Sequence, residues 1–333
     1  MIRQFTSVGV VGAGLMGSGI ARHITSHGAE VILVDADEAR LGEISQRFRD
    51  QPVKLTTDMS ELKDTEFVIE AVFEDIQVKH SVLQVISEHV AEETVIATNT
   101  SSLLVSDLST SVVNVDRFIG VHYNNPPDFN PIVEIIPLVE TDAKVVDAVH
   151  GWMNAMQKRA IVCADTPCFI LNRQSLPYIN EAARCLDIAT PGQIDAIACE
   201  FLGVSLGPFA VMNLVGLPVM AASSRNLAVL GEGYQPSDAL QQCARAATPE
   251  WQIEVSAAAD ESVQATVRDR LLGAMIFPGK DILEHGLCKR DDLHLICIEA
   301  LGYQHSSADL LEQLSPDELN RVLLCYLNAS QGL

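Results

Sequence analysis

The chain has 333 residues, 48% of them hydrophobic, and a formal net charge of −22. This length allows two domains of ordinary size, and the charge disfavours nucleic acid and anionic membranes as partners. No apolar run reaches membrane-spanning length and the first seven residues lack a secretory pattern, so we expect a cytoplasmic protein with no membrane partner.

The first half of the chain alternates short apolar runs with helical patterns. The expected strands cover residues 7–11, 31–35, 67–71, 95–98, 118–121, 132–136 and 159–163. The expected helices between the early strands cover residues 16–27, 38–48 and 76–90. Continuous apolar strands joined by helical crossovers are typical of a sheet that is covered on both faces. We therefore predict an α/β domain over residues 1–165, of the Rossmann type, with a doubly wound and mainly parallel sheet.

The second half, residues 166–333, changes to long helical patterns and predicts an all-α C-terminal domain. It contains a weak, degenerate internal repeat, in which Asp292 of the second copy takes the place of Asp195 in the first. The first copy, a linker that we expect to be partly mobile, and the second copy cover about residues 166–230, 231–257 and 258–333.

The turn after the first expected strand carries the pattern of a dinucleotide-binding loop. Its residues are Gly12-Ala13-Gly14-Leu15-Met16-Gly17, and an expected helix follows at once. The glycines permit a tight turn and a close approach to a pyrophosphate, and the helix N-terminus supplies unpaired N–H groups. Asp35 closes the second expected strand, where it can accept hydrogen bonds from the ribose of NAD and repel the 2′-phosphate of NADP. Ordinary turn glycines are the alternative, but the strand–loop–helix context favours NAD as the cofactor.

Polar side chains follow two later strands of the expected sheet. The segment 99–102, Asn-Thr-Ser-Ser, follows the fourth strand and His122 follows the fifth. Ligands of open parallel sheets bind beyond the carboxyl ends of the strands. Glu134 lies in the apolar sixth strand, where an unpaired carboxylate would be costly, so we predict that it pairs with His122. Ser101 could instead be only a helix cap.

This set of side chains suits the oxidation of an alcohol. A neutral imidazole can take up the hydroxyl proton and return it in the reverse reaction. A carboxylate on the far ring nitrogen fixes the tautomer and stabilises the imidazolium. Hydroxyl and amide donors can polarise the ketone oxygen during reduction. The eight cysteines lack metal-ligand spacing, so we expect reduced thiols and no metal.

Together these motifs resemble those of the 3-hydroxyacyl-CoA dehydrogenases, including the dehydrogenase part of fatty-acid oxidation multienzymes. The matching stretches are residues 8–21, 70–74, 99–103, 120–126, 133–137, 165–181 and 207–216. The resemblance implies that His122 is the catalytic histidine and that Glu134 orients it. It implies that Ser101 and Asn172 hold the substrate oxygen, although Asn172 could also be only a helical cap or bridge.

The resemblance also extends the expected cofactor site. It places Glu74 and Lys79 near the nicotinamide ribose, although the two could equally be a surface pair. It implies that Asn125 supports the histidine loop, and we place Asn99 and Asn125 with the cofactor-binding residues. Family members with one helical copy form dimers, and a second copy could occupy the partner's place. We therefore expect a monomer or a loose homodimer.

The chain departs from the family pattern in four places. Asp35 and Glu74 are only 39 positions apart, so the helical hairpin that helps to grip coenzyme A is missing. Asn124 replaces an aromatic residue and makes the pocket edge more polar, which favours a short or oxygenated acyl group. Cys168 replaces a glycine, and Asn213 replaces a common aspartate.

The predicted function is reversible hydride transfer between NAD and the hydroxyl-bearing carbon of a short or polar 3-hydroxyacyl-CoA. The shortened segment leaves a second hypothesis, a dehydrogenase that acts on hydroxyacyl groups carried by an acyl carrier protein in a polyketide-type pathway. A third hypothesis is a non-catalytic NAD-binding relative, which the intact polar set disfavours.

Overall fold

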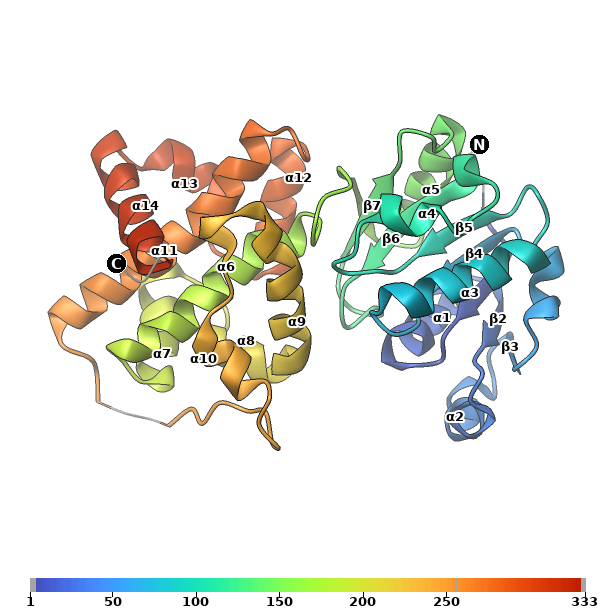
Figure 1. The fold of residues 1–333 in the computed structure, drawn as a ribbon, viewed down its shortest axis with the longest axis horizontal. Coiled ribbons are helices and arrows are strands. Elements are labelled where there is room, and N and C mark those ends of the chain that lie inside the picture. The colour runs from blue at the N-terminus through green and yellow to red at the C-terminus, as the bar shows by residue number, and fades with distance from the viewer. Residues whose placement is uncertain (1–3, 255–256, 331–333) are drawn as a thin grey trace. The chain divides into compact units, whose positions relative to one another are not determined.

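The chain divides into two compact units, Met1–Thr166 and Pro167–Leu333. The structure is a computed structural model that describes residues 4–254 and 257–330 (Figure 1). The two units are treated separately below.

The first unit is built on one eight-stranded sheet with the order β3-β2-β1-β4-β5-β6-β7-β8. All neighbouring strands run parallel except β6 and β7, which are antiparallel. This confirms the predicted Rossmann-type, mainly parallel sheet. The strands are β1 Ser7–Val11, β2 Glu30–Val34, β3 Val53–Thr56, β4 Phe67–Glu70, β5 Val95–Thr98, β6 Phe118–Tyr123, β7 Ile132–Pro137 and β8 Arg159–Val162.

Helices pack around this sheet and complete the crossovers. Asp37 and Asp75 cap the N-termini of α2 and α3 through their carboxylates, as expected for short acidic side chains at this position. The helices of the unit are α1 Leu15–Ser26, α2 Glu38–Ile44, α3 Ile76–His89, α4 Val105–Ser109 and α5 Ala143–Ala155, with 3₁₀ turns at Ser45–Phe48, Met59–Asp64 and Val115–Arg117.

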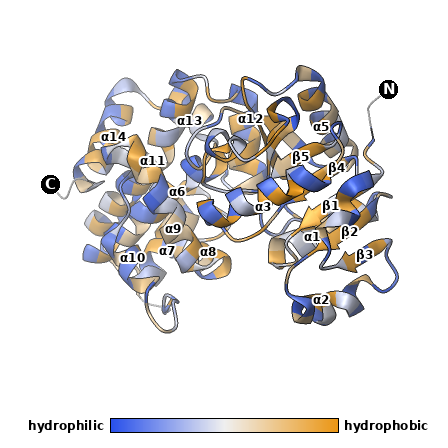
Figure 2. Ribbon diagram, turned by 45° about the vertical axis from the view of Figure 1, so that its right-hand side comes forward, coloured by the Kyte–Doolittle hydropathy of each residue, from blue (hydrophilic) through white to orange (hydrophobic). Residues whose placement is uncertain are grey.

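The apolar strands form the core of the first unit. Residues of β1, β4 and β5 are almost completely buried, and Figure 2 shows strands of this sheet largely in the hydrophobic colour. Phe5, Phe67 and Trp152 meet there with ring centroids 4.9–5.3 Å apart. Burial on this scale favours a rigid sheet, whose carboxyl edge can hold polar side chains in fixed positions.

The described residues of the second unit form helices and connecting loops, with no strand. Helix, turn and helix follow one another in both halves, as α6–α7 and as α11–α12, in agreement with the predicted all-α domain and its repeat. The helices are α6 Leu171–Arg184, α7 Pro191–Leu202, α8 Pro208–Val215, α9 Leu217–Leu227, α10 Asp238–Cys243, α11 Glu261–Glu284, α12 Arg290–Leu295, α13 Ser307–Gln313 and α14 Pro316–Ser330, with a π-helical turn at Ile296–Ala300 after α12.

The expected linker is more ordered in structure than the sequence indicated. Residues 231–254 contain α10, and Gln241 of this helix donates a hydrogen bond to the carbonyl oxygen of Ala221 in α9. Further along, the backbone of Trp251 pairs with the Asn213 side chain of α8. The linker thus packs on the first helical copy over these residues, and residues 255 and 256 lie outside the described part.

Candidate active site

The register between β6 and β7 places His122 directly opposite Glu134. Side chains of opposite residues on antiparallel strands lie on the same face and within contact distance. His122 Nδ1 lies 2.7 Å from Glu134 Oε2, and the two residues are 4% and 0% exposed. If Glu134 is ionised and the imidazole is neutral, this hydrogen bond requires the proton on Nδ1, and Nε2 then carries the lone pair. Such an imidazole can accept a proton.

The loop after β5 is organised around the carboxylate of Glu74. Glu74 Oε1 accepts hydrogen bonds from the backbone N–H groups of Ser101 and Ser102, at 2.8 and 2.9 Å. The hydroxyls of Thr100, Ser101 and Ser102 donate to the same oxygen, at 2.7, 3.2 and 3.0 Å. A carboxylate with this many donors fixes the loop conformation around Ser101.

A buried ion pair lies behind this loop. Lys79 of α3 donates from Nζ to Glu70 Oε1 at 2.8 Å and lies 3.4 Å from Glu74 Oε2. The side chains of Lys79 and Glu70 are 1% and 0% exposed. Burial raises the pKa of Glu74, but Lys79 and the loop donors outweigh this and hold the pKa below its ordinary value. Lys79 is therefore buried, whereas the side chain of Glu74 is 33% exposed, and the cofactor role of both residues stays a prediction.

The glycine loop between β1 and α1 has a backbone that a ligand can approach closely. Gly12 adopts φ +105°, and a Cβ atom on Gly17 would lie 1.8 Å from the carbonyl oxygen of Gly12. Space around a Cβ on Gly14 is open to 4 Å, and among the described side chains none caps the N-terminus of α1. These features fit a bound pyrophosphate, which needs exposed N–H groups and no side chain in its way.

A pocket of about 640 Å³ adjoins the glycine loop, within the usual range for ligand sites. Asp35 lies in its wall, where its carboxylate accepts hydrogen bonds from the backbone of Ala13 at 2.7 Å and Asp37 at 2.9 Å. Arg40 lies 3.9 Å from the same carboxylate, and its guanidinium lies 6.0 Å from the Phe73 ring centroid. The carboxylate and the pocket fit the adenosine half of NAD.

The loop that connects β6 to β7 is tied down on both sides. Lys158 donates from Nζ to the carbonyl oxygens of Pro127 and Asn130, at 2.6 and 2.7 Å. Arg22 of α1 pairs with Asp128 at 2.7 Å. These contacts hold the chain that follows His122.

The two asparagines of this loop lie differently. Asn124 is 8% exposed and donates to the carbonyl oxygen of Ile132 at 3.4 Å, so its amide serves the hairpin backbone. Asn125 is exposed. Asn99, at the end of β5, accepts a hydrogen bond from the backbone N–H of Tyr123 at 2.8 Å, which links the two strand ends. The roles of Asn99 and Asn125 toward the cofactor stay predictions.

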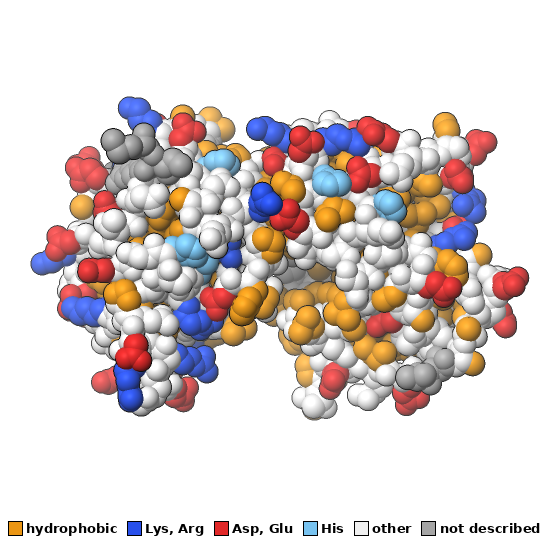
Figure 3. All heavy atoms as spheres, turned by 180° about the vertical axis from the view of Figure 1, so that it is seen from behind, with side chains coloured by type: hydrophobic (Ala, Val, Ile, Leu, Met, Phe, Trp, Pro, Cys, Tyr) orange, Lys and Arg blue, Asp and Glu red, His pale blue; other side chains and the backbone are white. Residues whose placement is uncertain are grey.

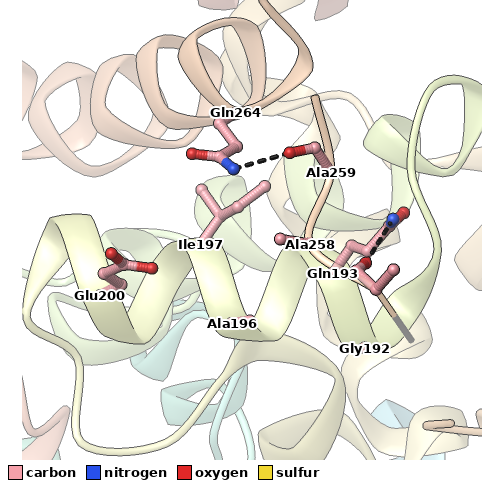
Figure 4. A pocket seen from close by; sticks show the side chains of 9 residues that line it. Gly192, Gln193, Ala196, Ile197, Glu200, Ala258, Ala259 and Gln264 are labelled. Carbon is pink, nitrogen blue, oxygen red and sulfur yellow. Dashed lines mark hydrogen bonds between the residues drawn. The ribbon is translucent and has the colours of Figure 1, made fainter. Parts of the chain in front are cut away.

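Asn172 belongs to the second unit. It is the second residue of α6 and is half-buried, and its role toward the substrate oxygen stays a prediction. The same unit holds a pocket of about 60 Å³, lined by α7 and residues 257–264 (Figure 4). This volume admits only a few water molecules. The larger pocket of the first unit is therefore the better ligand site.

Sequence reasoning missed Glu70 and Lys158. Glu70 ends an apolar strand, so the argument that singled out Glu134, the cost of an unpaired buried carboxylate, also applies to it. Lys158 lies outside every motif, and its contact with the β6–β7 loop depends on tertiary structure alone. Among the described residues, no group of three or more His, Cys, Asp or Glu side chains could hold a metal ion.

The fold and the polar groups at the carboxyl edge of the sheet are those of an NAD-dependent dehydrogenase. The family model "3-hydroxyacyl-CoA dehydrogenase, NAD binding domain" matches residues 7–52 and 49–166. The corresponding C-terminal domain model matches residues 169–250. The chain therefore belongs to the 3-hydroxyacyl-CoA dehydrogenase family. It is an oxidoreductase that acts on CH–OH groups with NAD.

Individual relatives agree with this assignment. Mitochondrial hydroxyacyl-coenzyme A dehydrogenase from Sus scrofa is 31% identical over 238 residues, 63% of this chain and 76% of that protein. A probable 3-hydroxybutyryl-CoA dehydrogenase from Deinococcus radiodurans is 30% identical, over 72% of this chain and 94% of that protein. The crystal structure of (S)-3-hydroxybutyryl-CoA dehydrogenase PaaH1 from Ralstonia eutropha superposes with a TM-score of 0.66 at 30% identity, over 72% and 93% of the two chains.

One solved structure extends the fold similarity to nearly the whole chain. 3-Hydroxybutyryl-CoA dehydrogenase from Escherichia coli K12 has a TM-score of 0.81 at 21% identity, over 99% of this chain and 96% of that one. The second helical copy thus has a counterpart in a known fold.

No described helix is long and apolar enough to cross a membrane. Acidic and basic side chains are interspersed over the face shown in Figure 3.

Proposed function

We propose that this enzyme interconverts 3-hydroxyacyl-CoA and 3-oxoacyl-CoA, with His122 as the acid–base group. The observation that carries the proposal is the buried 2.7 Å contact between His122 Nδ1 and Glu134 Oε2, on neighbouring strands at the carboxyl edge of a dinucleotide-binding sheet. The relatives' names support the substrate class, since they include 3-hydroxybutyryl-CoA and 3-hydroxyadipyl-CoA dehydrogenases.

Each side chain has a role in this reaction. Bound NAD supplies the hydride acceptor. His122 Nε2 takes the hydroxyl proton, and the carboxylate of Glu134 stabilises the imidazolium that results. In the reverse direction the same nitrogen returns the proton to the oxygen. When substrate is bound, the hydroxyl proton of Ser101 turns from Glu74 to the substrate oxygen and stabilises the charge that develops there during reduction.

The substrate that we propose is a coenzyme A thioester with a short acyl group. Between β2 and β4 the structure has α2, β3 and two 3₁₀ turns, so a helical hairpin does not stand in this described segment. The side-chain amide of Asn124 donates to the carbonyl oxygen of Ile132 in the β6–β7 hairpin. Asn124 therefore does not support the prediction of a polar pocket edge. The proposal of a short acyl group is supported instead by the relatives that are named 3-hydroxybutyryl-CoA dehydrogenases.

The first experiment measures NADH consumption with acetoacetyl-CoA and with acetoacetyl-acyl carrier protein side by side. Efficient turnover of the coenzyme A ester supports the proposal. Turnover of the carrier-bound ester alone would contradict a coenzyme A substrate and support the hypothesis of an acyl-carrier-protein substrate. Tight NADH binding without turnover of either ester contradicts catalysis and favours the non-catalytic alternative.

The acid–base role predicts specific losses in two variants. His122→Ala should lower kcat by about 10²- to 10⁴-fold, the usual contribution of a positioned acid–base group. Glu134→Gln should also lower kcat, because its neutral amide cannot stabilise the imidazolium. Steady-state kinetics would test both, with NADH binding measured by fluorescence as the control and expected within about two-fold of wild type, as for removal of a group used only in the transition state. A His122→Ala enzyme within a few-fold of wild-type kcat would contradict the assignment.

A further inference from the structure

The ion pair at Lys79 is unusual in its degree of burial. A lysine is rarely fully buried unless it is paired, because desolvation of its ammonium is costly. Lys79 is 1% exposed, and Glu70 Oε1 and Glu74 Oε2 lie 2.8 and 3.4 Å from its Nζ. Thr98 and the backbone of Val72 also donate to Glu70, each at 2.7 Å. The carboxylate of Glu70 is therefore fixed from three sides.

The two oxygens of Glu74 face different partners. Oε2 faces the Lys79 ammonium, and Oε1 accepts the five hydrogen bonds from residues 100–102. Lys79 lies on α3, whereas these three residues follow β5. A path of direct polar contacts therefore runs from Glu70 through Lys79 and Glu74 to Ser101.

We infer that Lys79 is a positioning residue, which holds Glu74 in place so that Glu74 fixes the backbone of Ser101 and thereby the position of its hydroxyl group. This inference rests on the proposed function of Ser101, and it differs from direct contact between Lys79 and the cofactor. Loss of the ammonium would leave the buried carboxylate of Glu70 and the partly exposed carboxylate of Glu74 without their cation. Glu74 would then take up a proton more readily, and its hydrogen bonds to the loop would weaken.

The test replaces Lys79 with methionine, which keeps the length of the side chain and removes the charge. We expect Lys79→Met to lower kcat by about 10- to 100-fold, since a misplacement of about 1 Å at a catalytic group can cost about 10²-fold. The acid limb of the rate of NADH-dependent reduction should move to higher pH. In that direction His122 must be protonated, so its protonation at low pH does not lower the rate. We therefore assign the fall in rate at low pH to protonation of Glu74. The loss should appear in kcat at saturating NADH, because the position of Ser101 affects the chemical step and not the occupancy of the cofactor site.

A double variant separates positioning from folding. Glu70→Gln combined with Lys79→Met removes both charges of the inner pair and keeps the net charge of the cluster at the wild-type value. We expect its thermal midpoint to recover relative to Lys79→Met. The shifted acid limb should persist, because Glu74 still lacks its cation. A merely structural role predicts that activity and pH profile recover together with stability.

A mutant cycle with Ser101→Ala completes the test. If Lys79 acts through Ser101, adding Lys79→Met to Ser101→Ala should cost less than about two-fold in kcat. Additive losses, an unchanged pH profile, or a loss seen mainly as weaker NADH binding would overturn the inference. An inactive wild type contradicts the proposed function, whereas an active wild type with an unaffected Lys79→Met variant contradicts the inference alone.

Discussion

His23 on α1 is a buried histidine outside the acid–base pair. It is 5% exposed, with Nε2 3.0 Å from the carbonyl oxygen of Met156 and Nδ1 3.3 Å from the hydroxyl of Tyr123. Burial, with a contribution from the nearby Lys158, lowers the pKa of His23 to about 4. The folded protein therefore accommodates this ring in its neutral form.

This lowered pKa predicts a loss of stability in mild acid. Because the unfolded chain binds the proton near pH 6.5 and the folded chain only near pH 4, the free energy of unfolding should fall as pH decreases through this window, by up to about 3 kcal/mol. Urea unfolding at pH 7.5, 6 and 5 would measure the slope. His23→Gln should flatten it, and His150→Gln on α5 serves as the control. Equal slopes in wild type and His23→Gln would show that another group dominates.

The contacts of a single residue could be predicted from the sequence where its side chain was chemically out of place in the surrounding pattern. An acidic residue in an apolar strand led to the pairing of Glu134 with His122, and the structure places them in contact. The surroundings of Lys79 were not readable, because its burial depends on how α3 packs against the sheet. Cys168 adopts φ +62°, a left-handed conformation that explains a glycine at this position in the family, but nothing in the structure explains the cysteine.

At the scale of elements, the strongly apolar strands were placed to within two residues. β1 and β5 have the predicted bounds, and β6 extends two residues further to include His122 and Tyr123. β3 was missed because its residues are only partly buried at the sheet edge, so they lack an apolar run. α5 was also missed, although its amphipathic pattern lies in the sequence.

Asn213 explains a departure from the family at this scale. Its amide donates to the carbonyl oxygen of Trp251 and accepts from the N–H of the same residue, each at 2.9 Å. An aspartate could only accept, because its ionised carboxylate has no donor. Asparagine at this position therefore fastens the linker between the helical copies to α8.

This contact predicts a specific loss in Asn213→Asp. The carboxylate would face the Trp251 carbonyl oxygen without a proton to donate, so the free energy of unfolding should fall by about 1–3 kcal/mol. Chemical denaturation would measure this, and limited proteolysis should cut the linker faster. Asn130→Asp is a matched control, because the Asn130 side chain accepts from the N–H of Ile132 and aspartate keeps that contact. Similar effects of the two substitutions would contradict the explanation.

At the scale of the whole molecule, the two helical copies are joined by buried polar contacts. Arg270 of α11 donates to Glu181 of α6 at 2.6 Å, and Glu181 is 0% exposed. Gln174 of α6 donates to the carbonyl oxygen of Met275 in α11 at 2.7 Å. The first helix of one copy thus packs against the first helix of the other within a single chain.

This packing predicts a monomer in solution. If the second copy occupies the surface through which a single-copy protein would pair, light scattering should give a mass near 36.1 kDa. A loose, concentration-dependent dimer would still agree with this view. A tight dimer that pairs through the first copy would contradict it, and cross-linking of residues in α6 would identify that case.

The register of β6 and β7 also bears on how substrate preference can diversify. The proposed proton-transfer pair is held by two paired strands, whereas residues 124–131 form the connection between them. We expect substitutions in that connecting segment to leave the proposed pair in place, provided that strand pairing is kept. The segment between the two strands is therefore one that directed evolution can vary while the proposed chemistry of the strands is kept.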